Sequence, residues 1–228
     1  MKNNEPIVIS LGGSLIVPDE INVDFLNSFV LTIKDYVLKG FNFLIITGGG
    51  KVCRRYNNSL KQIINPSDED LDWLGIASTR LNAELVRICF GDYAYEKVIL
   101  DPEFIPKTDK PIMVGGGWKP GNSSDLAAVY GAKSVGAQKI INLSNIDFVY
   151  DKDPKINSDA KPIYKMTWDE FRFLFPKNWN PGSNTPFDTI AAYEAEKLGY
   201  EVVILNGNNI DNLKNYLDEK EFVGTVIE

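Results

Sequence analysis

Glycine-rich turns next to charged side chains are the part of this sequence best suited to chemistry. Residues 48–51 (GGGK) directly follow an apolar run, and Arg54 comes one helical turn later. Residues 115–117 (GGG) also follow an apolar run and lead to Asp125. Free backbone N–H groups at such turns, together with nearby cations, bind phosphate well. The sequence therefore predicts a ligand that carries phosphate groups.

Asp125 lies in the first turn of a predicted helix that either Ser123 or Ser124 can cap. A carboxylate at this place can simply compensate the helix dipole. It can equally stand beside phosphate groups, where it would hold a metal ion or orient a cation. The local sequence leaves both interpretations open.

Histidine is absent from the 228 residues. This excludes Ser-His-Asp and Cys-His nucleophilic sites, histidine-ligated metals and imidazole acid–base steps. Any chemistry must use carboxylates, Lys, Arg, backbone donors or a bound ion. The GGGK turn matches neither GxxxxGK[ST] nor GxGxxG, so it is neither a Walker loop nor a dinucleotide fingerprint.

The composition is that of an ordinary globular protein, with 44% hydrophobic and 24% charged residues. A formal net charge of −7, from 24 basic and 31 acidic residues, argues against a nucleic-acid partner. With only Cys53 and Cys89, there is no disulfide framework and no paired-thiol zinc spacing. We find no membrane-spanning run and no signal peptide, and expect a cytoplasmic protein without a membrane partner.

Apolar runs of strand length alternate with helical patterns along the chain, which is typical of an α/β fold. We predict strands at 6–11, 41–47, 95–100, 112–114, 201–205 and 222–227, with one more apolar run inside residues 111–154. Helices are predicted from an Asn22 cap to Gly40, after the GGGK turn through Arg54 and Arg55, through 71–89, after Ser123 or Ser124, from a Thr167 cap to 175, and at 187–198 and 210–217. Residues 176–186 are a candidate lid.

Four polar loops follow apolar runs: 12–14 (GGS), 48–51, 115–125 and 144–153. In an open parallel sheet such loops gather along one edge, where ligands bind. The acidic cluster in the last loop lacks the glycine and terminal glutamate of a calcium loop. The pattern predicts a phosphate-rich or elongated ligand at that edge.

The motif order GGS, GGGKxxR, GIxxTRxNA, PGxxxD and SNxDxVYDxDP resembles the amino-acid kinase superfamily, and within it the archaeal type of uridylate kinase. The resemblance covers nearly the whole chain, and its segment NxDxVYxxDP is the most specific part. It implies a three-layer α/β/α sandwich with a mostly parallel central sheet, as a single domain at 1–228. An acceptor-binding lobe would cover about 1–140 and an ATP-binding lobe about 141–228. The implied reaction transfers the ATP γ-phosphoryl group to UMP, with Mg²⁺ carried by ATP, in a homo-oligomer that is commonly a hexamer.

The resemblance also implies roles for individual residues, and it implies no metal site built by the protein alone. The implied catalytic residues are Asp125, which would orient the catalytic cations, Lys51 and Arg54. The implied ATP-binding residues are Gly12, Gly13, Ser14, Gly49, Arg54, Ser144, Asn145, Tyr150 and Asp153. The implied UMP-binding residues are Gly48, Asp72, Trp118, Lys119, Pro120, Gly121, Asn122, Ser123 and Ser124.

The chain departs from the family pattern at several places. Phe148 follows Asp147 where a glycine is usual, and residues 122–124 (NSS) replace a common His-Thr-Thr run. Ser10 stands near the place where bacterial relatives carry a lysine. Two other functions are therefore considered: a kinase of another small phosphate or carboxylate, and a non-catalytic binder or storage protein.

Phosphate as acceptor is compatible with the absence of histidine. The second pKa of a phosphate monoester is roughly 6, so its attacking oxygen needs no general base at neutral pH. The protein must supply alignment and positive charge. Lys51 and Arg54 can supply that charge or can be solvated helix cations, and for Arg55 and Arg80 the sequence favours the surface interpretation.

Overall fold

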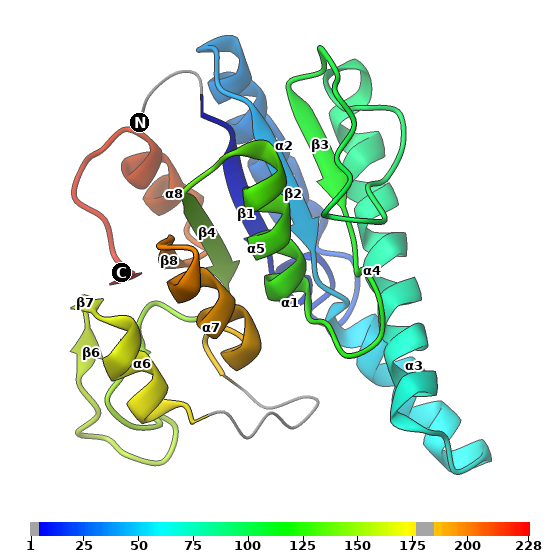
Figure 1. Ribbon diagram of the computed structural model, residues 1–228, viewed down its shortest axis with the longest axis vertical. Helices are drawn as coiled ribbons and strands as arrows, with labels where there is room; N and C mark the ends of the chain where they lie inside the picture. The colour runs from blue at the N-terminus through cyan, green and yellow to red at the C-terminus, as the bar shows by residue number, and fades with distance from the viewer. Residues whose placement is uncertain (1–4, 177–184) are drawn as a thin grey trace.

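A seven-stranded sheet forms the centre of the molecule, in the order β3-β2-β1-β4-β8-β9-β7 (Figure 1). The computed structural model describes residues 5–176 and 185–228. All neighbours in this sheet are parallel except β8 and β9, which are antiparallel. A second, two-stranded sheet pairs β5 with β6. The strands are β1 (Ile7–Leu11), β2 (Phe43–Thr47), β3 (Ile112–Gly115), β4 (Lys139–Ser144), β5 (Val149–Tyr150), β6 (Pro162–Ile163), β7 (Lys165–Met166), β8 (Glu201–Asn206) and β9 (Thr225–Ile227).

Helices cover both faces of the sheet, because alternate strand residues point to opposite sides and both sides are apolar. In β1, Ile7, Ile9 and Leu11 enter one core, and Val8 enters the other. The first core lies under α1, α2, α4 and α8, and the second under α5, α6 and α7. The helices are α1 (Gly13–Ile16), α2 (Val23–Leu38), α3 (Gly50–Ile63), α4 (Asp68–Phe90), α5 (Ser124–Val135), α6 (Trp168–Leu174), α7 (Thr189–Lys197) and α8 (Ile210–Leu217). The predicted three-layer α/β/α fold is confirmed.

Side-chain caps fix where several helices begin. Asn22 accepts a hydrogen bond from the Phe25 amide at the start of α2, and Thr167 forms a capping box with Glu170 at α6. Ser123, not Ser124, caps α5. The predicted caps at Asn22 and Thr167 are confirmed, and the choice left open at α5 is decided.

The predicted strand at 95–100 is wrong, since only Ala94 and Ile99 form isolated bridges, to Ile112 and Gly115. A bend at the charged residues 96–97 separates the two bridges and interrupts the ladder. The last strand starts at Thr225 and not at residue 222, because the Val223 backbone bonds to the Asn212 side chain of α8. Most of the candidate lid, residues 177–184, lies outside the described residues.

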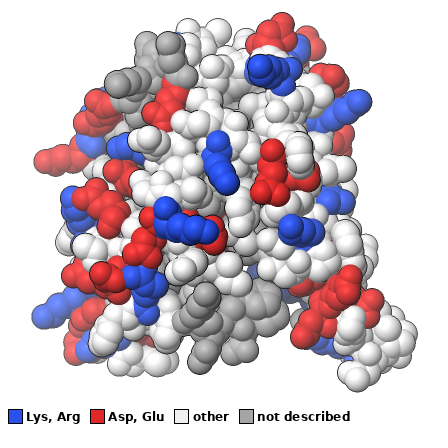
Figure 2. Space-filling model, in the orientation of Figure 1, with Lys and Arg blue, Asp and Glu red and all other residues white. Residues whose placement is uncertain are grey.

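Charge is mixed over the surface that Figure 2 presents, where Lys and Arg side chains stand among Asp and Glu side chains. Within the described residues, no helix is both long enough and apolar enough to cross a membrane.

Candidate active site

The glycine turns that follow β1 and β2 meet at the carboxyl-terminal edge of the sheet. The Gly48 amide donates to the Leu11 carbonyl, and the Gly12 amide donates to the Leu143 carbonyl, both at 2.8 Å. Parallel pairing brings the loops after β3 and β4 to the same edge. The predicted convergence of the polar loops is confirmed.

Close packing of backbone on backbone explains why two of these positions need glycine. A Cβ atom on Gly13 would lie 2.1 Å from the Gly50 nitrogen, and one on Gly50 would lie 2.2 Å from the Gly13 oxygen. Gly50 also has a φ of 61°, in the left-handed region that favours glycine. These two residues therefore allow the turns after β1 and β2 to touch, whatever ligand binds beside them.

The Asp125 carboxylate lies among groups from three other elements. Oδ1 accepts hydrogen bonds from Ser10 Oγ at 2.7 Å and from Asn142 Nδ2 at 3.4 Å, and Oδ2 accepts from the Asp188 amide at 3.0 Å. Burial raises the pKa of Asp125 to about 6, although the bonds from Ser10 and the Asp188 amide act in the opposite direction. Asp125 therefore has polar partners from β1, β4 and the start of α7 in addition to its place in the first turn of α5.

Asp188 belongs to this cluster, and the sequence analysis did not identify it. Its side chain caps α7 by accepting from the Ile190 and Ala191 amides, at 3.0 and 2.7 Å. Its negative charge also raises the pKa of Asp125. The only signal for Asp188 in the sequence is that of a helix cap, which gives no hint that Asp125 is near.

The loop between β3 and α5 (the β3–α5 loop, residues 116–123) carries most of the predicted UMP-binding residues. Asp72, on α4, accepts a 2.7 Å hydrogen bond from the Gly121 amide of this loop. The Lys119 ammonium lies 3.6 Å from the centre of the Trp118 ring, which packs edge-on against Tyr130. The structure therefore brings Asp72 together with the loop, although their predicted binding of UMP stays a prediction. Elsewhere in the loop, Asn122 bonds to the Pro120 carbonyl, and Ser123 caps α5 beside Ser124.

Helix α4 also contacts both glycine-containing loops through side chains for which the sequence analysis proposed no role. Asn82 Nδ2 donates to the carbonyls of Gly48 and Gly49, at 2.8 and 3.3 Å. Arg80 is half-buried and donates to the carbonyls of Gly117 and Trp118. The surface interpretation of Arg80 is therefore wrong, because sequence spacing does not show that this face of α4 meets the β3–α5 loop.

A cavity of about 440 Å³ lies beyond the end of β4 and contains four predicted ATP-binding residues, Ser144, Asn145, Tyr150 and Asp153. Thr225 connects β9 to the small β5–β6 sheet beside the cavity. Its hydroxyl accepts a 2.8 Å hydrogen bond from the Val149 amide and donates to the Ile163 carbonyl. The remaining wall is partly apolar, from Ile146, Phe148, Leu174 and Phe175. The cavity thus combines an apolar surface suited to a base with polar loop residues.

Comparison with known proteins identifies the group to which this architecture belongs. The model of the amino acid kinase family matches residues 5–206. This chain belongs to the amino acid kinase family. It is 32% identical to the uridylate kinase of Methanobrevibacter smithii and 29% identical to that of Sulfurisphaera tokodaii, in each case over 97% of this chain and 98% of the relative. It also resembles the crystal structure of uridylate kinase from Archaeoglobus fulgidus, with a TM-score of 0.80 and 29% identity over 98% of this chain and 100% of that one. The resemblance to archaeal uridylate kinases is confirmed.

The cations that the family resemblance marks as catalytic lie on the first turns of α3. Lys51 contacts the Asp19 carboxylate, and Arg55 lies 3.7 Å from the same carboxylate and 3.5 Å from Glu20. Arg54 is exposed. In this structure the charge of Lys51 is therefore compensated by Asp19, so its catalytic role stays a prediction.

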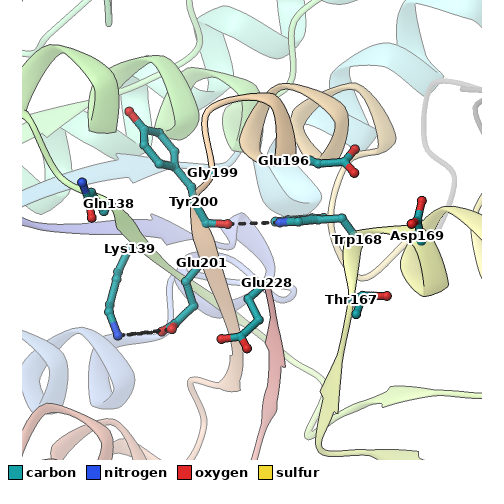
Figure 3. A pocket seen from close by; sticks show the side chains of 10 residues that line it. All are labelled: Gln138, Lys139, Thr167, Trp168, Asp169, Glu196, Gly199, Tyr200, Glu201 and Glu228. Carbon is teal, nitrogen blue, oxygen red and sulfur yellow. Dashed lines mark hydrogen bonds and ion pairs between the residues drawn. The ribbon is translucent and has the colours of Figure 1, made fainter.

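A second cavity, of about 520 Å³, lies at the opposite edge of the sheet in this member of the amino acid kinase family (Figure 3). Trp168 and Tyr200 both line it, and Trp168 Nε1 donates a hydrogen bond to the Tyr200 carbonyl at 3.1 Å. Each carboxylate in its lining contacts a cation: Asp169 and Glu196 contact Arg172, Glu201 contacts Lys139, and Glu228 contacts Lys165. None of the predicted site residues lines this cavity, so it is separate from the candidate active site.

Proposed function

We propose that this chain is a uridylate kinase, which transfers the γ-phosphoryl group of ATP to UMP and forms UDP. The observation that carries the proposal is the position of Asp125. It is the second residue of α5, just after the β3–α5 loop, and it accepts a hydrogen bond from Ser10, which lies just before the first glycine turn. It also bonds to the Asp188 amide, next to the part of the chain where Thr185 and Pro186 line the 440 Å³ cavity. Asp125 thus lies where an acceptor at the loop and a donor in the cavity would meet.

The proposed division of the site follows this geometry. ATP would occupy the cavity, with its phosphates directed to Gly12, Gly13, Ser14 and Gly49, while Tyr150 and Phe148 lie near the base. Gly12 connects the two parts, since a Cβ atom on it would be 3.5 Å from the Ser144 Cα atom. UMP would bind between Gly48, Asp72 and the β3–α5 loop. The proposed lobes, about 1–140 for the acceptor and about 141–228 for ATP, share the single sheet through the pairing of β1 with β4.

The proposed reaction depends more on alignment of the two nucleotides than on proton transfer. The UMP phosphate is largely ionised at neutral pH, because its second pKa is roughly 6. Holding the two nucleotides in line can contribute on the order of 7–11 kcal/mol. The glycine amides, Arg54 and Lys51 would reduce the repulsion between the phosphates.

Asp125 has the capacity to face a magnesium ion brought by ATP. A carboxylate has about four lone-pair sites, and Asp125 uses three of them in its bonds from Ser10, Asn142 and the Asp188 amide, so one remains on Oδ2. Mg²⁺ is usually bound by one or two carboxylates together with substrate phosphates. Among residues 5–176 and 185–228, no group of three or more His, Cys, Asp and Glu side chains is placed to hold a metal. The proposed metal would arrive on the nucleotide and neutralise phosphate charge.

The experiment that tests the proposal measures phosphoryl transfer from ATP to a panel of UMP, CMP and other monophosphates, with nucleotide binding followed by calorimetry. UDP formation with a preference for UMP is the expected result. Transfer to a different small phosphate or carboxylate, in place of UMP, would show that the acceptor is not UMP. Binding of nucleotides without transfer to any acceptor would instead indicate a binding or storage protein.

We further propose that the chain forms a homo-oligomer, with a hexamer as the expected size from the family resemblance. An apolar stripe on α4 supports this: Trp73, Leu81 and Ile88 are 48%, 63% and 60% exposed, about two helical turns apart. Sedimentation velocity should show a sedimentation coefficient above that of the 25.5 kDa monomer. Leu81→Glu should shift the protein toward monomer, while Leu31→Glu on α2 serves as a control. A monomeric wild-type protein would contradict the proposal. The cytoplasmic location expected from the sequence also stays a prediction.

A further inference from the structure

We infer that Arg80 is a positioning residue, which fixes the β3–α5 loop against α4 and thereby sets the affinity for the phosphoryl acceptor. This inference rests on the proposed function only in naming UMP as the acceptor. The loop contact itself is a property of the chain.

The guanidinium group of Arg80 holds two successive carbonyl groups of the loop. Its Nε atom donates to the Gly117 oxygen at 3.1 Å, and one terminal nitrogen donates to the Trp118 oxygen at 3.0 Å. The rigid, planar fork of arginine fits two such acceptors at once, whereas a lysine ammonium has a different geometry. Hydrogen bonds from a charged donor are also stronger than neutral ones.

Contacts around Arg80 reinforce this arrangement. The Gly117 amide donates to Thr79 Oγ1 at 2.6 Å, and the Gly121 amide donates to Asp72 on the same helix. A Cβ atom on Gly116 would lie 3.0 Å from the Arg80 Cα atom, so the loop backbone approaches α4 closely. Arg80 therefore acts near the point where the loop leaves β3, at Gly117 and at Trp118, the first loop residue proposed to contact UMP.

The same helix holds the other side of the proposed transfer site. Asn82, two residues after Arg80, donates to the carbonyls of Gly48 and Gly49. Helix α4 thus connects the acceptor loop to the glycine turn beside which the phosphoryl group would pass. Because a misplacement of about 1 Å can reduce a rate on the order of 100-fold, this connection matters for turnover as well as for binding.

The chain offers a matched control for Arg80. Arg87 lies on α4 two turns further along, is also half-buried, and pairs with Glu84 one turn back. Arg80→Gln and Arg87→Gln remove the same charge from the same helix, but only the first removes contacts to the loop. Arg80→Lys keeps the charge and provides a second, milder variant if Arg80→Gln does not fold.

Two measurements test the inference. Steady-state kinetics of Arg80→Gln should show a KM for UMP raised about 10-fold to 100-fold and a KM for ATP within about twofold of the wild type. Amide hydrogen exchange of residues 116–122 should be faster in Arg80→Gln and unchanged in Arg87→Gln. Arg80→Lys should fall between the wild type and Arg80→Gln in both measurements.

Some outcomes would overturn the inference. An unchanged KM for UMP together with unchanged exchange would show that the contacts to Gly117 and Trp118 do not position the loop. Equal increases in the KM values of UMP and ATP, with faster exchange throughout the protein, would indicate a general structural role instead. If the wild-type chain does not phosphorylate UMP at all, the proposed function fails, while the exchange measurement still decides whether Arg80 holds the loop.

Discussion

The Ser10 hydroxyl donates a 2.7 Å hydrogen bond to Oδ1 of Asp125, across 115 residues of sequence. This bond joins β1, just before its glycine turn, to the first turn of α5. Burial raises the pKa of Asp125 to about 6, and the bond from Ser10 opposes that rise. The pair therefore sets both the place and the charge of the carboxylate on which the proposed transfer depends.

Asp125→Asn should abolish most UDP formation while the fold is retained. The amide has a similar shape but lacks the negative charge that would face the magnesium ion and orient the cations, so we expect kcat to fall roughly 100-fold or more. Activity would be measured with saturating ATP and UMP, and the fold by circular dichroism. Full activity in this variant would refute the assigned role.

The same variant should unfold less readily than the wild type at neutral pH. A pKa raised from 3.8 to about 6 means that ionised Asp125 disfavours the folded state, by up to about 3 kcal/mol. Between about pH 4 and pH 6 the folded state holds a proton that the unfolded state has lost, so the free energy of unfolding falls as the pH rises through this window. Urea unfolding should therefore show a gain for Asp125→Asn at pH 7 that disappears near pH 4. A gain that does not depend on pH would contradict the assignment.

Ser10→Ala should shift the acid limb of the rate profile to higher pH. The proposed reaction needs ionised Asp125, and the lost hydrogen bond no longer lowers the pKa of this carboxyl group. Asp188→Asn should shift the limb the other way, because it removes a negative charge that raises the pKa of Asp125 while an asparagine still caps α7. The phosphate pKa of UMP is the same in all three proteins. A limb that stays in place in both variants would therefore belong to the substrate.

Tyr150→Leu should raise the KM for ATP about 10-fold and leave the KM for UMP nearly unchanged. Tyr150 lines the 440 Å³ cavity proposed for ATP, and the loss of an aromatic contact to a base costs about 1–3 kcal/mol. Tyr193→Leu, on α7 and outside the cavity lining, is the control. A larger effect on the KM for UMP would mean that the two proposed subsites are assigned the wrong way round.

Gly13→Ala should lower the free energy of unfolding by roughly 3 kcal/mol, because its methyl group would overlap the Gly50 backbone at 2.1 Å. Gly75→Ala is the matched control. Its Cβ atom would meet only the Cys53 sulfur, at 3.4 Å, in the interior of α4, where alanine is favoured over glycine by about 1 kcal/mol. We therefore expect opposite signs for the two substitutions in thermal unfolding. Equal effects would show that the two glycine turns can move apart.

Local signals in the sequence predicted most of the helices and long strands in their order, though not the short strands β5, β6 and β7. They also predicted the caps at Asn22 and Thr167 and the polar loops that end the strands. Those features depend on residues a few positions apart, so pattern and capping chemistry are sufficient to predict them. Asp125 also stood out, because a carboxylate after a glycine loop is a local observation. The family resemblance, carried by short motifs, then assigned it a role.

Only the tertiary structure decided what surrounds these residues. The sequence indicates a surface charge at Arg80, whereas the structure packs α4 beside the β3–α5 loop and Arg80 bonds to it. The sequence indicates only a helix cap at Asp188, whereas the structure places its amide against Asp125. Similarly, residues 95–100 have the apolar character of a strand, but a bend at 96–97 leaves only isolated bridges to β3, at Ala94 and Ile99. The physical reason is common to all three. Hydrogen bonds between segments distant in sequence depend on which elements the sheet places side by side. Local sequence patterns do not predict which elements these are.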